Sequence, residues 1–297
     1  MNKFSIYSEP TAEMILTLLA DAYKDEKKIE KILEDFYKNY TKEFQKILKQ
    51  LEKDGRIDLS EGISLRDHPR VYRIIQEAEN KQWDKLMEQA WIWMQLSMEE
   101  SLKRTYKETF ILTYKLFEPM IPQARNLLDM VNVQITDTYI TQRVLPIPWC
   151  QDGKTYSARL YGHVANFQKK LNFVLEEGIN KGKGMDWMMQ AWRKLTNSTA
   201  YDTARLLKTE TVAMWSMATK QAYINMGIEY VEIIGDAECG GICTDYVGEA
   251  IPLREAELGD ELPPYHPNCA CSYIAYEEVE EIPIEETDEE DNFDLSD

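Results

Sequence analysis

The chain has 297 residues, and 44% of them are hydrophobic, so it is long enough for one large domain or two medium ones with a substantial core. It carries 34 basic and 52 acidic side chains, which gives a formal net charge of −18. An evenly acidic protein repels phosphates and binds nucleic acid poorly. The charge is uneven, however: residues 154–225 contain eleven bases and five acids, whereas residues 277–297 contain twelve acids and no base.

No segment of the chain has the pattern of a targeting or membrane-spanning sequence. The apolar run from Met14 to Ala20 is short and lies between Glu13 and Asp21, which suits neither a signal peptide nor a membrane span. We therefore expect no membrane partner and a reducing cytosol, where clustered cysteines bind metal more often than they form disulfides. Cys150 stands apart from the other four cysteines and is expected to pack as a small apolar side chain.

The first half of the chain is helical in pattern. Apolar residues between Leu16 and Leu51 recur largely at spacings of three and four, and Gly55 ends that run. Pro69 suits the first turn of a second helical stretch, which is rich in aromatic residues and stops before Pro119. This pattern predicts two or three long helices packed side by side.

A connector and three more helices are expected after this region. Pro146, Pro148 and Gly153 crowd into the segment 143–153, which is typical of an irregular linker and of a domain boundary. The pattern then predicts a helix over 157–178, a helix that contains Trp187 and Trp192, and a separate helix that starts at Ser198 or Thr199 and ends at Gly227.

Beyond Gly227 the spacing of apolar residues changes to that of strands. Strands are predicted at 230–234, 250–253 and 272–276, on either side of a cysteine-rich loop. The expected fold is mainly α, with long N-terminal helices and a C-terminal helical domain that ends in a small β-containing Cys/His module. The predicted divisions are a helical region 1–148, a second domain 149–276 and an acidic, disordered tail 277–297.

The cysteine-rich loop offers five candidate metal ligands: Cys239, Cys243, His266, Cys269 and Cys271. A structural zinc ion needs four thiolate or imidazole ligands, and Gly240-Gly241 would let the first two cysteines face the same ion. The preferred set is Cys239, Cys243, His266 and Cys269, with Cys271 as a substitute because it begins a strand. The spacing favours one structural zinc, and a cap held by thiol packing without metal remains the alternative.

The sequence offers two other kinds of site. A cysteine nucleophile paired with His266 is disfavoured, because the clustering of the other thiols argues for ligation. The basic stretch could bind DNA or an acidic protein surface through six residues: Lys169, Lys170, Lys181, Lys183, Arg193 and Lys194. Without a nucleic-acid-binding motif, a solvated face that pairs with the acidic end of the same chain is the preferred interpretation.

Four motifs between Trp149 and Tyr276 together resemble the phage Mu F-like minor head proteins, also called head morphogenesis proteins. In chain order they are Lys208-Thr209-Glu210, which stands where that family has Arg-Thr-Glu, then Tyr223 to Ile228, then Cys239 to Leu253, and Pro263 to Cys271. The last motif reproduces Pro-Pro-x-His-Pro-Asn-Cys-Arg-Cys except for Ala270. The first two cysteines are spaced by three residues here, and by two in most of the family.

The resemblance implies a non-enzymatic structural protein of a tailed phage or prophage, without catalytic residues or a small-molecule substrate. Such proteins act in head morphogenesis and associate with the portal protein and other capsid proteins. They are made in the host cytoplasm and remain in the virion, in the capsid interior or at the portal vertex. The alternatives are a zinc- or thiol-dependent hydrolase, and an internal head protein that binds the packaged DNA.

Overall fold

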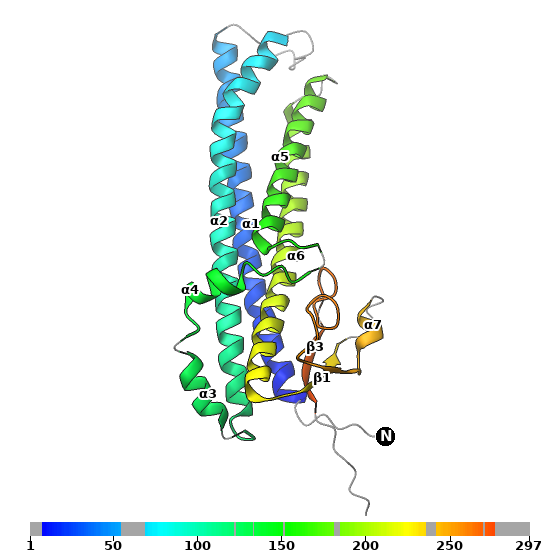
Figure 1. Cartoon of the computed structure of the whole chain (residues 1–297). Helices are drawn as coiled ribbons and strands as arrows, with labels where there is room; N and C mark the ends of the chain where they lie inside the picture. Colours follow the sequence, from blue (N-terminus) through cyan, green and yellow to red (C-terminus); the bar gives the residue numbers. More distant parts are fainter. Residues whose placement is uncertain are drawn as a thin grey trace, which may run out of the picture.

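The fold is mainly helical with a small antiparallel sheet near the C-terminus, as the sequence predicts. The computed structural model describes residues 8–54, 69–121, 123–132, 134–150, 152–180, 185–235, 242–269 and 271–276. The acidic tail expected at 277–297 lies outside the described residues. Figure 1 shows two long helical hairpins, with the sheet beside the lower half of the second hairpin.

The first hairpin consists of α1 (Ser8–Lys53) and α2 (Pro69–Phe117). The two predicted ends, before Gly55 and at Pro69, agree with these bounds. The apolar stripes of the two helices meet in the core, where Ile29 and Leu33 of α1 and Met98 of α2 are at most 1% exposed. The prediction of long helices packed side by side is therefore confirmed.

Three short elements lead the chain away from the first hairpin. They are α3 (Gln123–Asn132), α4 (Asp137–Tyr139) and the π-helical turn η2 (Ile140–Val144). Thr136 caps α4, because its hydroxyl accepts a hydrogen bond from the Tyr139 backbone N–H at 3.1 Å. The irregular segment predicted at 143–153 overlaps η2 at Arg143 and Val144, and the chain beyond Val144 leads into the second hairpin.

The second hairpin consists of α5 (Tyr156–Asn180) and α6 (Met185–Met226). The prediction of two helices in place of α6 is wrong, because one helix runs through Ser198 and Thr199 without a break. In the polar run where a break was expected, the Thr196 hydroxyl donates to the Trp192 carbonyl one turn earlier, at 2.9 Å. This bond satisfies the hydroxyl inside the helix, so the residue need not act as a cap.

The end of α6 explains the motif Tyr223 to Ile228. Gly227 has a φ of +82°, the left-handed conformation that glycine adopts without strain. The Ile228 N–H donates to the Tyr223 carbonyl and the Gly227 N–H to the Ile224 carbonyl, at 3.0 and 3.1 Å. These two bonds form a Schellman cap, which stops the helix and turns the chain toward the sheet.

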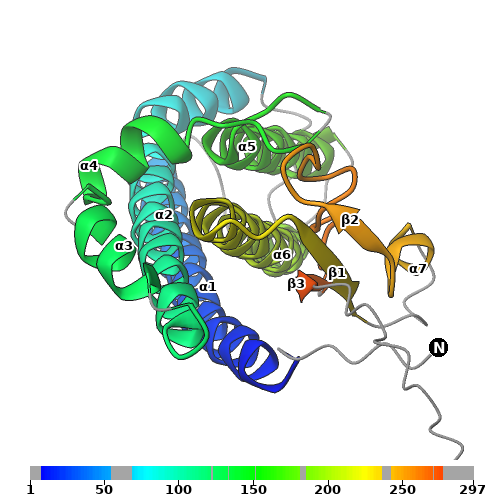
Figure 2. The same cartoon turned by 60° about the horizontal axis from the view of Figure 1, so that its bottom comes forward.

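The sheet has the strand order β2-β1-β3, and both pairs are antiparallel. The strands are β1 (Tyr230–Ile234), β2 (Ala250–Pro252) and β3 (Ser272–Tyr276), so all three predicted strands are present. A four-residue helix, α7 (Cys243–Tyr246), lies between β1 and β2. In Figure 2 the sheet and α7 lie on the side of α6 that faces away from α1 and α2.

Helix α6 is the central element of the fold, since it packs against α1, α2, α5 and β3. One cluster of buried side chains includes Leu33 of α1, Leu102 of α2, Leu207 of α6 and Val231 of β1. This cluster therefore contains residues from both sides of the boundary predicted at 148/149, and the boundary itself stays a prediction. Among the described helices, none combines the length and the apolar character that crossing a membrane requires.

Replacing Trp192 by alanine should destabilise the fold by about 3–5 kcal/mol, because a large buried side chain leaves a cavity. Trp192 is 0% exposed, and its ring meets Tyr40 of α1 edge-on at a centroid distance of 4.8 Å. The matched control is Tyr201→Ala on the same helix, where the side chain is 63% exposed and the cost should stay within about 1 kcal/mol. Urea unfolding of both variants measures the difference, and equal costs would contradict the packing described here.

Candidate metal centre

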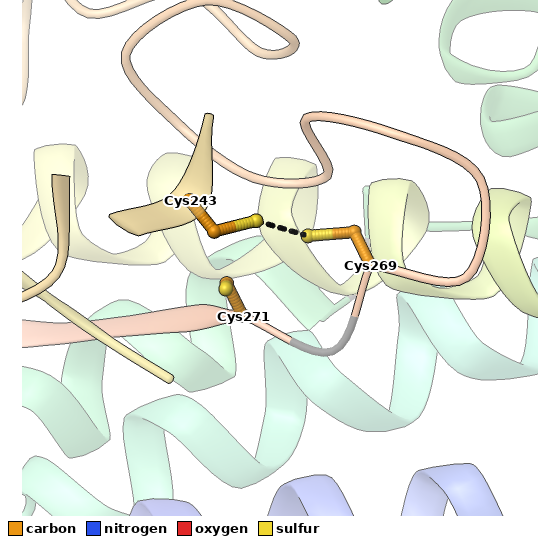
Figure 3. Close-up of side chains that lie close together, drawn as sticks. All are labelled: Cys243, Cys269 and Cys271. Atoms are coloured by element: carbon orange, nitrogen blue, oxygen red, sulfur yellow. Dashed lines mark hydrogen bonds between the residues drawn. The ribbon is translucent and has the colours of Figure 1, made fainter. Parts of the chain in front are cut away.

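Three cysteines from two parts of the chain meet beside the sheet. The sulfur atoms of Cys243, Cys269 and Cys271 all lie within 4.8 Å of one another. Figure 3 shows the Cys243 and Cys269 thiols pointing toward each other, with Cys271 next to them. The Sγ atoms of Cys243 and Cys269 are 3.8 Å apart, and all three side chains are at most 3% exposed.

Local backbone geometry brings each thiol to this point. Cys243 is the first residue of α7, and Cys271 comes directly before β3. Cys269 ends a tight turn in which its N–H donates to the His266 carbonyl at 3.0 Å, and Asn268 takes a left-handed φ of 63°, which asparagine tolerates better than most residues. Gly235 follows β1, and a Cβ atom there would lie 2.6 Å from the Cys271 sulfur.

His266 contacts Cys243 and has a defined tautomer. Its Nδ1 lies 2.9 Å from the Pro267 carbonyl oxygen, which can only accept, so Nδ1 carries the proton. The Nε2 atom is then the unprotonated nitrogen, and it lies 3.1 Å from the Cys243 sulfur. A second hydrogen bond that fixes the tautomer in this way is typical of histidines that bind metal.

The distance between two of these sulfur atoms fits a tetrahedral zinc ion. With Zn–S bonds of about 2.3 Å, two sulfur ligands of a tetrahedron lie about 3.8 Å apart, and this is the distance between Cys243 and Cys269. The His266 Nε2 is close to the Cys243 sulfur but lies outside the group of mutually close ligand atoms, so its ring would have to turn toward Cys269 and Cys271 to bind the same ion. Three cysteines therefore supply three suitably placed donors, and His266 is the candidate for the fourth.

The structure places the five predicted ligands as follows. Cys243, Cys269 and Cys271 are brought together, and His266 contacts Cys243. Cys239 and the Gly240-Gly241 bend lie outside the described residues. The sequence favoured Cys269 over Cys271 as a ligand, because a strand would fix the direction of the Cys271 side chain. In the structure Cys271 precedes the strand, and its sulfur lies in the cluster together with those of Cys243 and Cys269.

The cluster is enclosed by protein. The rings of Tyr246 and Tyr265 stack at 5.1 Å, and Tyr265 packs against the three cysteines. Burial raises the pKa of the Tyr265 hydroxyl, and the nearby thiols raise it further. A cavity of about 390 Å³ lies next to the cluster and is lined by His266, but none of the three cysteines lines it.

The cysteine module is attached to α6 through a second motif. The Asn268 backbone N–H donates to the Thr209 hydroxyl at 3.1 Å, and the Thr209 hydroxyl donates to the Arg205 carbonyl at 2.9 Å. Ser216, two turns further along, donates to the Pro263 carbonyl at 2.6 Å. The segments Lys208 to Glu210 and Pro263 to Cys271, which carried the resemblance in the sequence, are therefore in direct contact.

Glu210 anchors a buried ion pair that sequence reasoning missed. Its side chain is 1% exposed, and its two oxygens accept hydrogen bonds from Arg159 Nη1 at 2.6 Å and from Trp149 Nε1 at 2.8 Å. Arg159 also donates to both oxygens of Asp152 at 2.8 and 3.2 Å, and its guanidinium lies 4.7 Å above the Trp149 ring. Nothing in the spacing of these residues marks the arginine as the partner of a buried carboxylate.

The electrostatics of this network follow from burial and pairing. Burial raises the pKa of Glu210, although the hydrogen bonds from Trp149 and Arg159 oppose the shift. The Arg159 hydrogen bonds lower the pKa of the Asp152 carboxyl. The two carboxylates raise the pKa of Arg159 in spite of its partial burial, so it stays a cation.

The predicted contact residues of the basic stretch lie on the second hairpin. Lys169 and Lys170 are exposed on α5, and Arg193 and Lys194 are exposed on α6. Lys181 and Lys183 lie outside the described residues. Arg193 shares a cavity of about 360 Å³ with Glu30 and Glu34 of α1, so acidic groups accompany part of this basic face.

Comparison with known proteins gives no relative: no family model, no curated protein and no solved structure matches this chain. The resemblance to minor head proteins stays a prediction carried by the motif residues themselves.

Removing the cation of the buried pair should be costly. Arg159→Met leaves Glu210 buried without its partner, and we expect a loss of about 3–5 kcal/mol in the free energy of unfolding at neutral pH. The pKa of Glu210 then rises further, because burial is no longer opposed by the cation. A carboxyl whose pKa is raised in the folded state stabilises at low pH and loses that stability as pH rises, so the variant should recover part of its loss near pH 5.

The double variant Arg159→Met with Glu210→Gln is the matched control. It removes both charges and keeps an acceptor for Trp149, so most of the lost stability should return and its recovery near pH 5 should disappear. Urea unfolding at two pH values measures both variants. A single variant that costs under about 1 kcal/mol would show that the pair does not hold this region together.

Proposed function

We propose that this chain is a minor head protein of a tailed phage or prophage. It acts without catalysis in head morphogenesis and associates with the portal protein or the inner capsid wall. The cysteine module is a folding element that holds one structural zinc ion. The long helices and the basic face of α5 and α6 supply contact surfaces for capsid proteins, and the virion is its final location.

The observation that carries this proposal is the hydrogen bond between Asn268 and Thr209. These residues are 59 positions apart in the chain and belong to the two motifs that resemble the minor head family most closely. The motif Tyr223 to Ile228 forms the helix cap that directs the chain into β1. The motifs that resemble the minor head family thus contact or orient one another in a single packed unit. We expect this if they are the structural signature of a common fold.

The donor set supports a structural role for the metal. A structural zinc ion has four protein ligands, whereas a catalytic zinc keeps one position open for water. Cys243, Cys269 and Cys271 supply three donors buried away from the adjacent cavity, and His266 beside Cys243 is the candidate for the fourth. This arrangement favours the structural protein over the zinc- or thiol-dependent hydrolase.

An exposed apolar patch on α2 is the best place to test partner binding. Ile92, Trp93 and Leu96 are 40%, 57% and 59% exposed within two turns of the helix. Apolar side chains grouped in this way on a surface mark interaction sites more often than isolated ones do. We assign this patch to the portal contact.

The full chain should co-purify with the portal protein from cells that assemble procapsids. The double variant Trp93→Ser with Leu96→Ser should reduce the recovered amount at least about tenfold, because the central apolar contacts of an interface dominate its affinity. Tyr201→Ser, an equally exposed aromatic on α6, is the control and should co-purify normally. A protein found only outside heads would refute the proposed function, whereas equal recovery of all variants would refute only the assignment of the patch.

Elemental analysis of protein purified without chelator should find about one zinc per chain. Cys269→Ser and Cys271→Ser should each lose most of the metal, whereas Cys150→Ser should retain it, because Cys150 lies apart from the cluster. Metal removal should speed hydrogen exchange in the segment 242–269 and leave the helical circular-dichroism signal unchanged. A metal-free protein with slow exchange in this segment would favour thiol packing instead.

A further inference from the structure

A second cavity, separate from the cysteine module, has the features of a ligand site. It has a volume of about 630 Å³ and lies between η2, α6 and the segment 257–260. This volume is within the range of pockets that hold small ligands or parts of peptides. Its apolar lining comes from η2 and the segment after it and from α6, and includes Val144, Ile147, Met217 and Ile224.

Tyr106 brings an unsatisfied donor to this cavity. Its side chain is 3% exposed and lines the cavity, yet its hydroxyl has no hydrogen-bond partner within the part of the chain that the structure describes. The hydroxyl is also not among the side-chain atoms that are fully buried without a partner, so it keeps access to the cavity. The hydroxyl is therefore available to donate a hydrogen bond to a ligand in the cavity.

Two cations line the same cavity. The Lys220 ammonium has three donors, and within the described chain it makes one hydrogen bond, to the Ala256 carbonyl. Burial lowers the pKa of Lys220, and this effect outweighs the nearby carboxylates of Glu257 and Glu261. Arg143 of η2 is exposed at the cavity and forms no ion pair with any described residue.

The acidic residues of the cavity do not satisfy these donors. Glu257 and Asp260 also line it, but both are exposed and therefore hydrated. Within the described residues neither carboxylate forms an ion pair with Lys220 or Arg143. The groups with unused hydrogen-bonding capacity among the described residues at this cavity are thus donors, the Tyr106 hydroxyl from α2 and the Lys220 ammonium from α6, and a bound anionic acceptor would pair with both.

We propose that this cavity binds a carboxylate that is attached to an apolar group. The apolar part packs on Met217 and Ile224, and the carboxylate accepts hydrogen bonds from Tyr106 and Lys220, with Arg143 at the edge. Such a group can be a free small acid or an aromatic residue next to an acidic one in a polypeptide. The π-helical turn supports a functional role here, since π turns are frequent at functional sites.

The test uses the full-length protein with methyl-labelled methionine, in which the Met217 signal is identified by its loss in Met217→Leu. N-Acetylphenylalanine should shift this signal in a saturable way, and N-acetylphenylalanine amide, which lacks the charge, should bind at least about tenfold more weakly. The blocked dipeptide acetyl-Phe-Asp-amide identifies the source: tighter binding than the free acid indicates a polypeptide segment, and weaker binding indicates a small acid or a chain end.

Variants separate recognition from folding. Lys220→Met and Tyr106→Phe should each weaken binding of N-acetylphenylalanine about three- to tenfold. Arg143→Gln removes the positive charge at the edge of the cavity, and because Arg143 is exposed the variant leaves the core intact. Lys194→Met on the same helix is the control and should bind as the wild type does. The proposal fails if the Met217 signal does not shift, if acid and amide bind equally, or if Arg143→Gln, Lys220→Met and Tyr106→Phe all leave the affinity unchanged.

Discussion

Helix α6 is buried on almost every side between residues 203 and 219, and this burial constrains the rest of the structure. Helices α1, α2 and α5 and strand β3 all pack on it, so its polar side chains depend on hydrogen-bond partners inside the protein, and among the described residues Trp215 Nε1 and Thr219 Oγ1 have none. Thr196, Thr209 and Thr211 donate to carbonyls of their own helix one turn earlier. Glu210 cannot do so, and it therefore needs Arg159 and Trp149 from outside the helix.

The same burial explains which parts of the fold the sequence could predict. Helix α1 has one apolar face, so its period and its end before Gly55 were readable. The segment around Thr196 to Thr199 looked like a helix start because such residues cap helices in isolation, but packing against α1 overrides that preference. The short strands were readable because β-branched and aromatic residues are concentrated in them and turn residues bound them.

The candidate site was predictable in its chemistry and only partly in its geometry. Cysteine and histidine identities marked the ligands, but the sequence could not show that Cys269 and Cys271 both turn inward before β3 begins. The contact of Asn268 with Thr209 joins segments far apart in the chain, and only the folded helix brings them together. Arg159 looked like any surface arginine on a basic helix, and nothing in its neighbours indicated the buried pair with Glu210.

Helix α6 stabilises one part of the cysteine module, and the cysteine cluster stabilises another. A sheet with one strand of three residues is too small to be stable alone. Helix α6 supports β3, because Tyr273 packs on Trp215 and donates to the Ser216 carbonyl. Strand β3 in turn pairs along the whole of β1.

Helix α7 has no comparable contact with α6 in the described chain. Cys243 is the buried residue of α7, and it contacts His266 and Cys269, which lie 23 and 26 positions further along the chain. A metal ion that joins Cys243 to Cys269 and His266 would close this loop in the folded state and add its binding free energy to the stability of the module. The ion would therefore fix α7 and the turn at His266, whereas β1 and β3 would be held chiefly by α6.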